Sequence, residues 1–460
     1  MKLVADPRPK GITLKNEVSW AFGSIATGAV TNAVTIFALF FLTIHVGLEA
    51  AIAGFLIFAT KLYDAISDPI MGRISDNWQG KTGRRSPFLC GGALLLGLSF
   101  FLFFNLPPMG TAVAVPVVLL LLIMINTGYT IFAVPYLALA PDVAPTYHSR
   151  TRLMSYRVFF LMMGVLVGAV IAPKLVELPG GYRLMGIIIG SIVVVAGGIA
   201  FLGIRKFDAS LPLPEPTPES FVQMALKSAS QFMSVFETKP FTVLTLVKLL
   251  QFVVLATVLA SFPYFFTFVL RKSFAEFGTY MGLFSVSGII AIPFIRLIIG
   301  AMGKRSAYVG FLTLYAIGLL SWYFWTPSEP EIFFYARAVL IGVVSIGTLF
   351  CALALLPDTM EYDRLISGQS REGTISGVFT LVEKVASAFG PLLVGLILQA
   401  TGLITSKNPL SDTLTVQPDQ ALTAIRLAAS VIPALITLLC IAVLFKYRLT
   451  AQMLADLKQD

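Results

Sequence analysis

The sequence predicts an all-α membrane protein with twelve transmembrane helices arranged in two six-helix halves. Of its 460 residues, 57% are hydrophobic and only 12% are charged, against about 45–50% apolar and about 25% charged in an ordinary soluble domain. Apolar segments of about 20 residues, the length that crosses a bilayer as a helix, recur along the whole chain, as in "MGIIIGSIVVVAGGIAFLGI". The ten-residue segments of alternating polarity that mark a transmembrane β-barrel are absent from the sequence.

The first half, residues 1–204, is expected to hold six spans, each an apolar run that ends at charged, Pro or Gly residues. The N-terminal "MKLVADPRPKGITLKNEVSW" is too polar and too rich in Pro for a secretory signal, so the first span is expected to stay in the mature protein. The predicted spans are 18–46, 50–75, 87–107, 112–140, 152–176 and 183–204.

A polar segment, residues 205–240, separates the two halves. It opens with acidic residues spaced by prolines and closes with "FVQMALKSASQFMSVF", whose apolar residues recur at helical spacing. We interpret it as a cytoplasmic linker that ends in an amphipathic helix lying on the membrane surface. The second half, residues 241–460, is predicted to contain spans at 241–270, 276–302, 306–326, 331–357, 372–402 and 418–446.

The cationic side chains indicate the orientation. They gather in the short loops that share a side with the linker and both termini, which the positive-inside rule makes cytoplasmic. The expected location is therefore the inner membrane of the cell, with both termini in the cytoplasm. The net charge of +9 is interpreted as this topology signal and not as a nucleic-acid surface, because the cations follow the loops: Lys81, Arg84, Arg85, Arg150, Arg152, Lys304, Arg305, Arg364 and Arg371.

The sequence lacks the usual signatures of enzymes and of structural metal sites. Its three cysteines are far apart with no CxxC pair, and it has two histidines, so neither a disulfide framework nor a Cys/His metal site is indicated. HExxH, GxSxG and P-loop motifs are also absent. We expect a protein that is not an enzyme and has no cofactor. A separate ATPase subunit and a receptor that transports nothing stay open as alternatives.

The stretch "KLYDAISDPIMGRISD" places Lys61, Asp64 and Asp68 inside an apolar helix. A charge at mid-bilayer costs about 2.5–3.5 kcal/mol on insertion scales, so such residues indicate function. The spacing of four residues puts both carboxylates on one helical face, where they repel unless a cation or a proton lies with them. Ser67 adds an oxygen, and Lys384 in a later span can act as the counter-charge. The competing interpretation is a static ion-pair network that only fixes packing.

Other charges lie nearer to helix ends. Arg157, Lys248, Arg296 and Arg337 fall within about two turns of a span end, where long side chains can snorkel to the interface. A glycine-rich charged loop follows the second span, and we expect it to act as a cytoplasmic gate, with a plain topology signal as the alternative. The gating candidates are Gly72, Asp76, Arg84 and Arg85.

The same stretch, followed by "GRRSPF", resembles the second helix and first cytoplasmic loop of the glycoside, pentoside and hexuronide cation symporters, which belong to the major facilitator superfamily. The blocks "YTIFAVPYLALAPD", "RTRLMSYRVFF" and "LPDTMEYDRL" through "EKVASAFG" agree in order and spacing. The resemblance implies the major facilitator fold and coupling to Na⁺, Li⁺ or H⁺. It implies a coupling-ion site formed by Asp64, Asp68, Ser67 and Thr130.

The resemblance also suggests positions that bind the solute. The helix-five arginine and helix-eleven lysine of the family match Arg157 and Lys384, but its two sugar-binding acids fall on Gly28 and Ala133, and its sugar-stacking tryptophan on Leu137. A neutral galactoside is therefore a poor candidate. A small polar solute, anionic or derived from a sugar, fits better. The candidate binding residues are Arg157, Lys384, Tyr136, Asn32, Tyr129 and Gln251.

The second candidate cargo is a lipid-like amphiphile, because "VPYLAL" also resembles the lysophospholipid symporters. In both cases the expected partners are a small-molecule solute, a monovalent cation and the lipid bilayer, with no nucleic acid, and the expected state is a monomer. The sequence therefore predicts a cation-coupled secondary symporter that works by alternating access.

Overall fold

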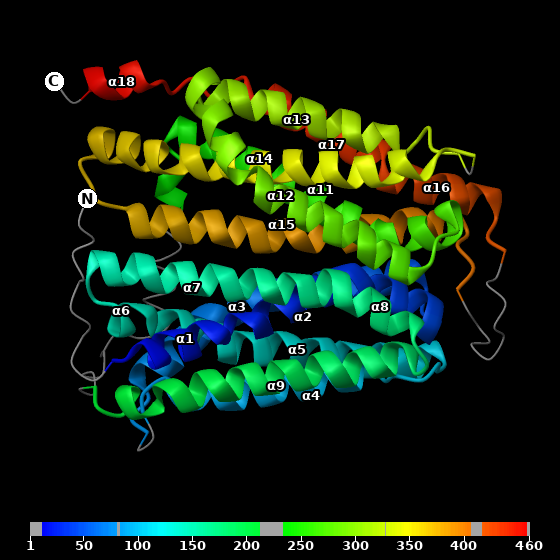
Figure 1. Cartoon of the computed structure of the whole chain (residues 1–460), viewed down its shortest axis with the longest axis horizontal. Helices are drawn as coiled ribbons and strands as arrows, with labels where there is room; N and C mark the ends of the chain where they lie inside the picture. Colours follow the sequence, from blue (N-terminus) through cyan, green and yellow to red (C-terminus); the bar gives the residue numbers. More distant parts are fainter. Residues whose placement is uncertain (1–11, 81–82, 212–232, 327, 406–415, 458–460) are drawn as a thin grey trace. The chain divides into compact units, whose positions relative to one another are not determined.

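The computed structural model describes residues 12–80, 83–211, 233–326, 328–405 and 416–457, and these residues form long helices joined by short loops (Figure 1). No strand occurs among the described residues. The prediction of an all-α membrane protein is confirmed. The chain divides into two compact units, which are described one at a time.

Unit 1 contains the helices from α1 to α9, together with the first turn of α12. Within it, α4 and α9 lie side by side, as do α2 and α7 (Figure 1). Its helices are α1 (Leu14–Phe22), α2 (Ser24–Phe40), η1 (Phe41–Val46), α3 (Ala50–Asn77), α4 (Ser86–Phe104), α5 (Thr111–Ala138), α6 (Ala140–Val143), α7 (Tyr147–Leu166), η2 (Val167–Ile171), α8 (Ala172–Glu177) and α9 (Gly181–Asp208).

Unit 2 contains the helices from α11 to α18, apart from that first turn of α12. Within it, α11 packs against α15 and α17, and α13 packs against α14 and α17. Its helices are α11 (Lys239–Tyr264), η3 (Phe265–Leu270), α12 (Phe274–Met302), α13 (Lys304–Ser321), α14 (Glu331–Ser367), α15 (Glu372–Ala400), α16 (Asp419–Ala429), α17 (Val431–Leu444) and α18 (Ala451–Asp456).

The twelve predicted spans correspond to helices in the structure. Among the described residues, eleven helices are long and apolar enough to cross a membrane. The remaining predicted span, 306–326, corresponds to α13, whose first turn carries Lys304 and Arg305. The tenth span was predicted too short, since α14 continues through Pro357 to Ser367. The predicted amphipathic helix of the linker lies largely outside the described residues. The domain boundaries at 204 and 240 stay predictions.

The first and seventh spans end in the same way. The first closes with the π-helix η1 and then Gly47 at φ 88°, and the seventh closes with η3 and then Arg271 at φ 53°. In each span, the residue after the cap donates its backbone N–H to a carbonyl inside the π-helix. Leu48 donates to the Leu42 carbonyl, and Lys272 donates to the Phe266 carbonyl. The seventh span therefore has an arginine where the first span has a glycine.

Replacing Arg271 by glycine is expected to stabilise the protein. Arg271 has the only positive φ outside glycine among the described residues, and this left-handed conformation costs a non-glycine residue about 1–2 kcal/mol. The greater freedom of glycine in the unfolded chain offsets about 0.5–1 kcal/mol. We expect Arg271→Gly to raise the thermal unfolding midpoint of the detergent-solubilised protein, and Arg271→Ala, which removes the same side chain, to give no such gain. Equal midpoints for the two variants would contradict this interpretation.

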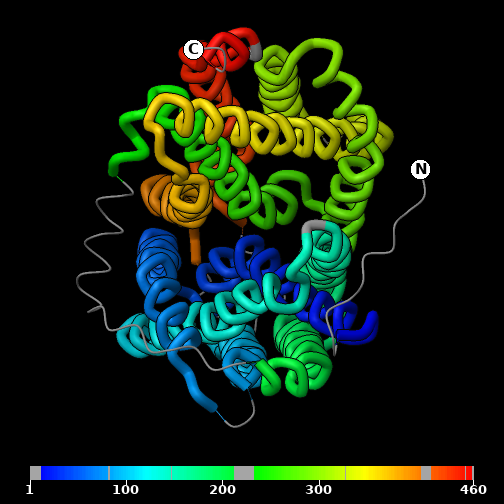
Figure 2. Tube along the Cα trace, turned by 90° about the vertical axis from the view of Figure 1, so that its left-hand side faces the viewer, coloured from blue at the N-terminus to red at the C-terminus, as the bar shows by residue number. Residues whose placement is uncertain are grey.

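Close helix contacts in unit 1 depend on glycine. A Cβ on Gly97 would lie 2.6 Å from the Gly190 carbonyl oxygen, and a Cβ on Gly190 would lie 2.7 Å from the Gly97 carbonyl oxygen. The backbones of α4 and α9 therefore touch, as small residues allow between membrane helices. In the view along the helices, the same two elements are again neighbours (Figure 2).

Candidate functional site

A series of polar contacts joins α3 to α5 inside unit 1. The Asn126 side-chain amide donates to the Thr60 carbonyl at 3.2 Å, and the hydroxyls of Tyr63 and Thr127 lie 2.9 Å apart. These contacts recur at intervals of three and four residues because such positions share one face of a helix. One turn further along, the same face of α3 carries Asp64 and Asp68.

The two aspartates converge on one hydroxyl. Thr130 Oγ1 lies 2.8 Å from Asp64 Oδ1 and 2.9 Å from Asp68 Oδ1. Ser67 Oγ lies 3.3 Å from the same Thr130 oxygen and also donates to the Asp64 carbonyl. Asp64 is 3% exposed and Thr130 is 2% exposed. The four residues expected from the sequence to bind the coupling ion are therefore neighbours, with two carboxylates and two hydroxyls facing one another.

This arrangement attracts a positive charge. A threonine hydroxyl has one proton, so at any moment it donates to only one of the two carboxylates. Carboxylates so close repel when both are ionised, and a bound cation or a proton relieves that repulsion. The described residues contain no group of three or more His, Cys, Asp or Glu side chains that could hold a metal ion. The carboxylates of Asp64 and Asp68 are the groups that the sequence analysis predicts to bind the coupling ion.

The predicted gate forms a charge cluster at the end of unit 1 where α4 begins. Arg85 binds the Asp76 carboxylate, donates to Asp142 Oδ2 at 2.9 Å and donates to the Ala138 carbonyl at 2.6 Å. Arg84 also approaches Asp142, at 3.5 Å. Gly72 lies on α3 one turn before Asp76. The loop is thus linked to α3, α5 and α6 at once.

Two acids in this cluster escaped the sequence analysis. Asp142 could have been found from the "LAPD" block, because unit 2 has a similar block, "LLPD". The aspartate of that block, Asp358, accepts a hydrogen bond from the Lys304 ammonium at 2.7 Å. No local sequence pattern indicated a role for Asp208, at the end of α9. Its Oδ2 accepts the backbone N–H groups of Arg85 and Ser86 at 2.9 and 2.7 Å, so it caps α4 from another helix.

The solute-binding candidates of unit 1 have different surroundings. Tyr136 is 1% exposed, stacks on Trp20 at 4.4 Å and has its hydroxyl 2.7 Å from that of Ser24, which suits packing better than ligand binding. Asn32 donates to the Gly28 carbonyl of its own helix, and Tyr129 is half-buried on α5. Arg157 on α7 is half-buried, with its Nε free of protein hydrogen bonds, so it is the candidate best prepared for an anionic group.

The solute-binding candidates of unit 2 also have different surroundings. Gln251 donates to Thr348 Oγ1 at 2.8 Å and accepts the Tyr308 hydroxyl at 2.6 Å, so both ends of its amide join helices. Lys384 is half-buried on α15. Lys248 does not snorkel, because it is 4% exposed, lies 2.9 Å from Glu383 and sits over the Phe379 ring at 3.7 Å.

Gly28 shows why one expected sugar-binding acid is missing. A Cβ at this position would lie 2.6 Å from the Leu161 carbonyl oxygen and 3.1 Å from the Gly164 Cα. On the facing helix, a Cβ on Gly164 would lie 2.5 Å from the Ile25 carbonyl oxygen. The backbones of α2 and α7 meet here, so position 28 has no room for a carboxylate.

Many membrane-spanning helices and two carboxylates inside one of them are the features of a polytopic membrane transporter. The chain belongs to the MFS/sugar transport protein family, whose sequence model matches residues 19–451. This confirms the resemblance found in the sequence, and it confirms that the protein is a membrane transporter and not an enzyme.

Curated relatives match along most of the chain. A "Putative glycoside/cation symporter YagG" of Escherichia coli is 25% identical over 95% of this chain and 93% of its own length. A "Putative sulfoquinovose importer" of the same organism is 23% identical over 87% of this chain and 84% of its own. Symporters are thus among the relatives of this chain, although none of these names establishes its solute.

Solved structures show the same fold. The nucleoside transporter NupG superposes with a TM-score of 0.64 at 12% identity, covering 95% of this chain and 99% of its own. A bacterial homologue of the human lysosomal transporter Spinster gives a TM-score of 0.66 at 16% identity, covering 95% and 98%. At this level of identity the likeness concerns the fold, and it confirms the major facilitator architecture.

Proposed function

We propose that the protein is a cation-coupled secondary symporter that imports a small polar solute, anionic or derived from a sugar, by alternating access. The observation that carries the proposal is the convergence of Asp64 and Asp68 on the Thr130 hydroxyl. We propose Na⁺, Li⁺ or H⁺ as the coupling ion. We also propose the inner membrane as its location, cytoplasmic termini and a monomeric state.

The carboxylate pair supports coupling more strongly than it supports a static network. A fixed ion pair inside a membrane needs its cationic side chain in place. Replacing such a pair by apolar residues is often neutral or stabilising. The Thr130 hydroxyl, a neutral group, lies within hydrogen-bond distance of both aspartates. A mobile cation or proton completes such a site and can leave it, which coupled transport requires.

The charges around the proposed solute positions favour an anion. Arg157 presents a half-buried guanidinium whose Nε has no protein partner, and the second proposed ligand, Lys384, is also cationic. Arginine recognises carboxylate, phosphate and sulfonate groups well because its donors are planar and fixed. A sulfonated sugar, a uronate or another organic acid is therefore the proposed solute class, in line with the sulfoquinovose importer among the relatives.

A lysolipid-like amphiphile is the second candidate cargo. Its support is the "VPYLAL" segment on α5, where Leu137 is 45% exposed at the place of the family's sugar-stacking tryptophan. An apolar side chain there suits an acyl chain better than a sugar ring.

A thermal-shift matrix tests both ideas. The purified protein is heated with Na⁺, Li⁺, K⁺ or a pH series, each crossed with uronates, sulfonated sugars, neutral galactosides and lysolipids. A cation and a solute that bind cooperatively are expected to raise the unfolding midpoint more together than the sum of their separate effects, because coupling between two sites is reciprocal. A ligand at 100 times its Kd adds about 2.7 kcal/mol of stability.

The outcome separates the candidates. Joint stabilisation by a monovalent cation and a sulfonated or uronic sugar supports the main proposal, and joint stabilisation by lysolipids alone supports the amphiphile. If every solute acts equally in Na⁺, K⁺ and across pH, the protein is not cation-coupled.

A further inference from the structure

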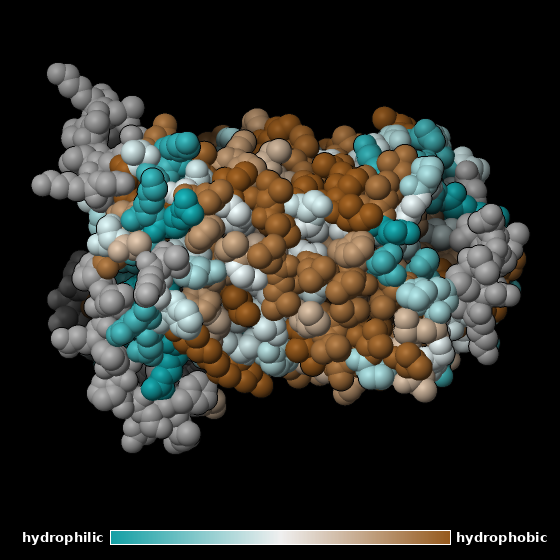
Figure 3. Space-filling view, turned by 90° about the horizontal axis from the view of Figure 1, so that it is seen from below, coloured by the Kyte–Doolittle hydropathy of each residue, from teal (hydrophilic) through white to brown (hydrophobic). Residues whose placement is uncertain are grey.

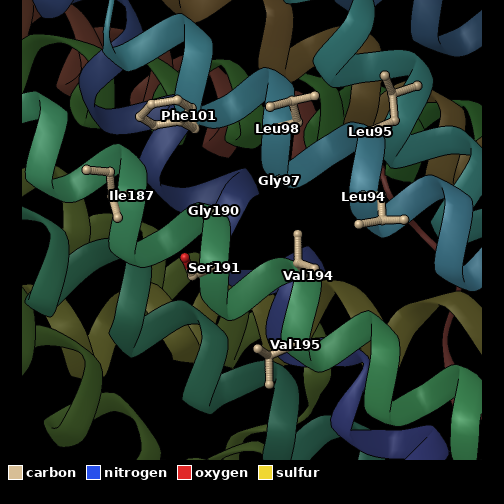
Figure 4. Close-up of a pocket in the computed structure, with 10 residues that line it drawn as sticks. All are labelled: Leu94, Leu95, Gly97, Leu98, Phe101, Ile187, Gly190, Ser191, Val194 and Val195. Atoms are coloured by element: carbon tan, nitrogen blue, oxygen red, sulfur yellow. The ribbon is translucent and has the colours of Figure 1, made fainter.

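An apolar groove and a polar pocket follow one another along the seam between α4 and α9. The groove, about 710 Å³ in volume, is lined by ten residues of the two helices (Figure 4). The pocket, about 390 Å³, lies beyond the Phe101 and Ile187 end of the groove and includes Phe104, Asn105 and Arg183. Both belong to unit 1.

The two hollows lie on the same faces of the two helices. On α9, Arg183 of the pocket precedes Ile187 of the groove by four residues, and at the end of α4 the exposed Asn105 of the pocket follows Phe101 of the groove by four. Residues three and four apart share a helical face, so groove and pocket form one continuous track. The groove exists because Gly97 and Gly190 bring the two backbones into contact and leave no side chain between them.

The groove opens on the surface that the bilayer covers. Its rim residues Leu94, Leu98 and Val195 are 51%, 54% and 57% exposed, and both helices are membrane spans. The view from below, onto the face where α4 and α9 lie, shows a hydrophobic belt with hydrophilic groups at its two ends (Figure 3). Hydrocarbon is therefore the medium that meets the groove.

The pocket offers positive charge at one end of this belt. Arg183 is exposed, and His45 and Asn105 add polar groups to the same lining. The nearby acid Glu177 is engaged, since its carboxylate accepts the Ala275 backbone N–H. A negatively charged head group is thus the chemistry that fits the pocket.

The length of the track also agrees with the thickness of one leaflet of the bilayer. Arg183 lies about 17 Å along α9 from Val194 in the groove, at 1.5 Å per residue, and one leaflet of a bilayer is about 15 Å of hydrocarbon. A lipid whose phosphate meets Arg183 therefore places its acyl chain along the groove as far as the bilayer centre.

We propose that this track is a binding site for a phospholipid of the leaflet at the N-terminal end of α9, with the phosphate at Arg183 and one acyl chain in the groove. The site is on the outer side of α4 and α9 and is independent of the coupling-ion site. The bound lipid fills the hollow beside the glycine contacts of the two helices and so holds them together.

Native mass spectrometry of the full-length protein tests the proposal, with phosphatidylglycerol and diacylglycerol of identical acyl chains as probes. Each cation near a membrane surface contributes about 1 kcal/mol to the binding of an anionic lipid, which is about a fivefold change in affinity. Arg183→Gln is expected to reduce the preference for phosphatidylglycerol about fivefold, whereas Arg271→Gln, at an exposed helix end outside the pocket, leaves it unchanged.

A second variant tests the groove. Ser191→Phe fills it from α9 and is expected to weaken the binding of both lipids, while Thr313→Phe, at a position on α13 that is also exposed, serves as the control. Equal lipid binding in Ser191→Phe and Thr313→Phe would overturn the proposal. So would a dimer that Ser191→Phe dissociates, since a second copy would then occupy the groove, or binding of glycerol 3-phosphate as tight as that of the lipid.

Discussion

Replacing Asp64 or Asp68 by asparagine is expected to weaken coupling-ion binding at least about thirtyfold. Removing one charge from a hydrogen-bonded contact between a carboxylate and a cation costs about 2–5 kcal/mol, and about 2 kcal/mol is a factor of about 30. Asparagine keeps the shape of the side chain and one oxygen near Thr130, so the loss reports the charge and not the packing. The measurement is the cation concentration at half-maximal thermal stabilisation, compared between each variant and the wild type.

Three further variants make this result specific. Glu49→Gln makes the same change from carboxylate to amide at an exposed position at the start of α3 and is expected to leave the cation response unaltered. Thr130→Ser keeps the hydroxyl and is expected to behave like the wild type. Thr130→Val loses it and is expected to weaken cation binding at least about tenfold, since a hydrogen bond to a charged group contributes about 1.5–3 kcal/mol. Full cation response in both aspartate variants would show that the ion binds elsewhere.

Restoring the family's acid at position 28 is expected to damage the protein and not to create a sugar site. An aspartate there would bring its Cβ to 2.6 Å from the Leu161 carbonyl oxygen. Overpacking costs about 1–3 kcal/mol, and the added charge in a span costs about 2.5–3.5 kcal/mol more. Gly28→Asp is therefore expected to lose at least about 3 kcal/mol of stability, seen as a lower unfolding midpoint and a smaller monodisperse fraction after purification.

Two controls separate the contact from the charge. Gly28→Ala introduces the Cβ alone and is expected to show the overpacking cost without the charge. Thr31→Asp places the same carboxylate three residues along α2 at an exposed position and is expected to fold better than Gly28→Asp. A Gly28→Asp protein that is as stable as the wild type and binds an α-galactoside would show that position 28 faces a solute cavity.

The local pattern of the sequence was enough to predict the membrane spans and to predict that Asp64 and Asp68 share one helical face. A bilayer forces each crossing segment to be a helix of nearly fixed length, and a spacing of four residues fixes a shared helical face. The assignments of Gln251 and Tyr136 as solute ligands stay predictions, because a polar side chain in a span gives the same sequence pattern whether it joins helices or meets a ligand. The structure finds both engaged with other helices.

The sequence by itself determined that the chain spans a membrane many times, that it resembles cation symporters, and that its second span carries a carboxylate pair. Only the tertiary structure decided that Thr130, more than 60 residues away, lies at hydrogen-bond distance from both carboxylates, and that Asp208 caps α4 across a separation of 123 residues. It also decided that Gly28 faces the α7 backbone. The physical reason is that periodicity is a property of one helix, whereas such contacts depend on which helices are neighbours and on how closely their backbones approach.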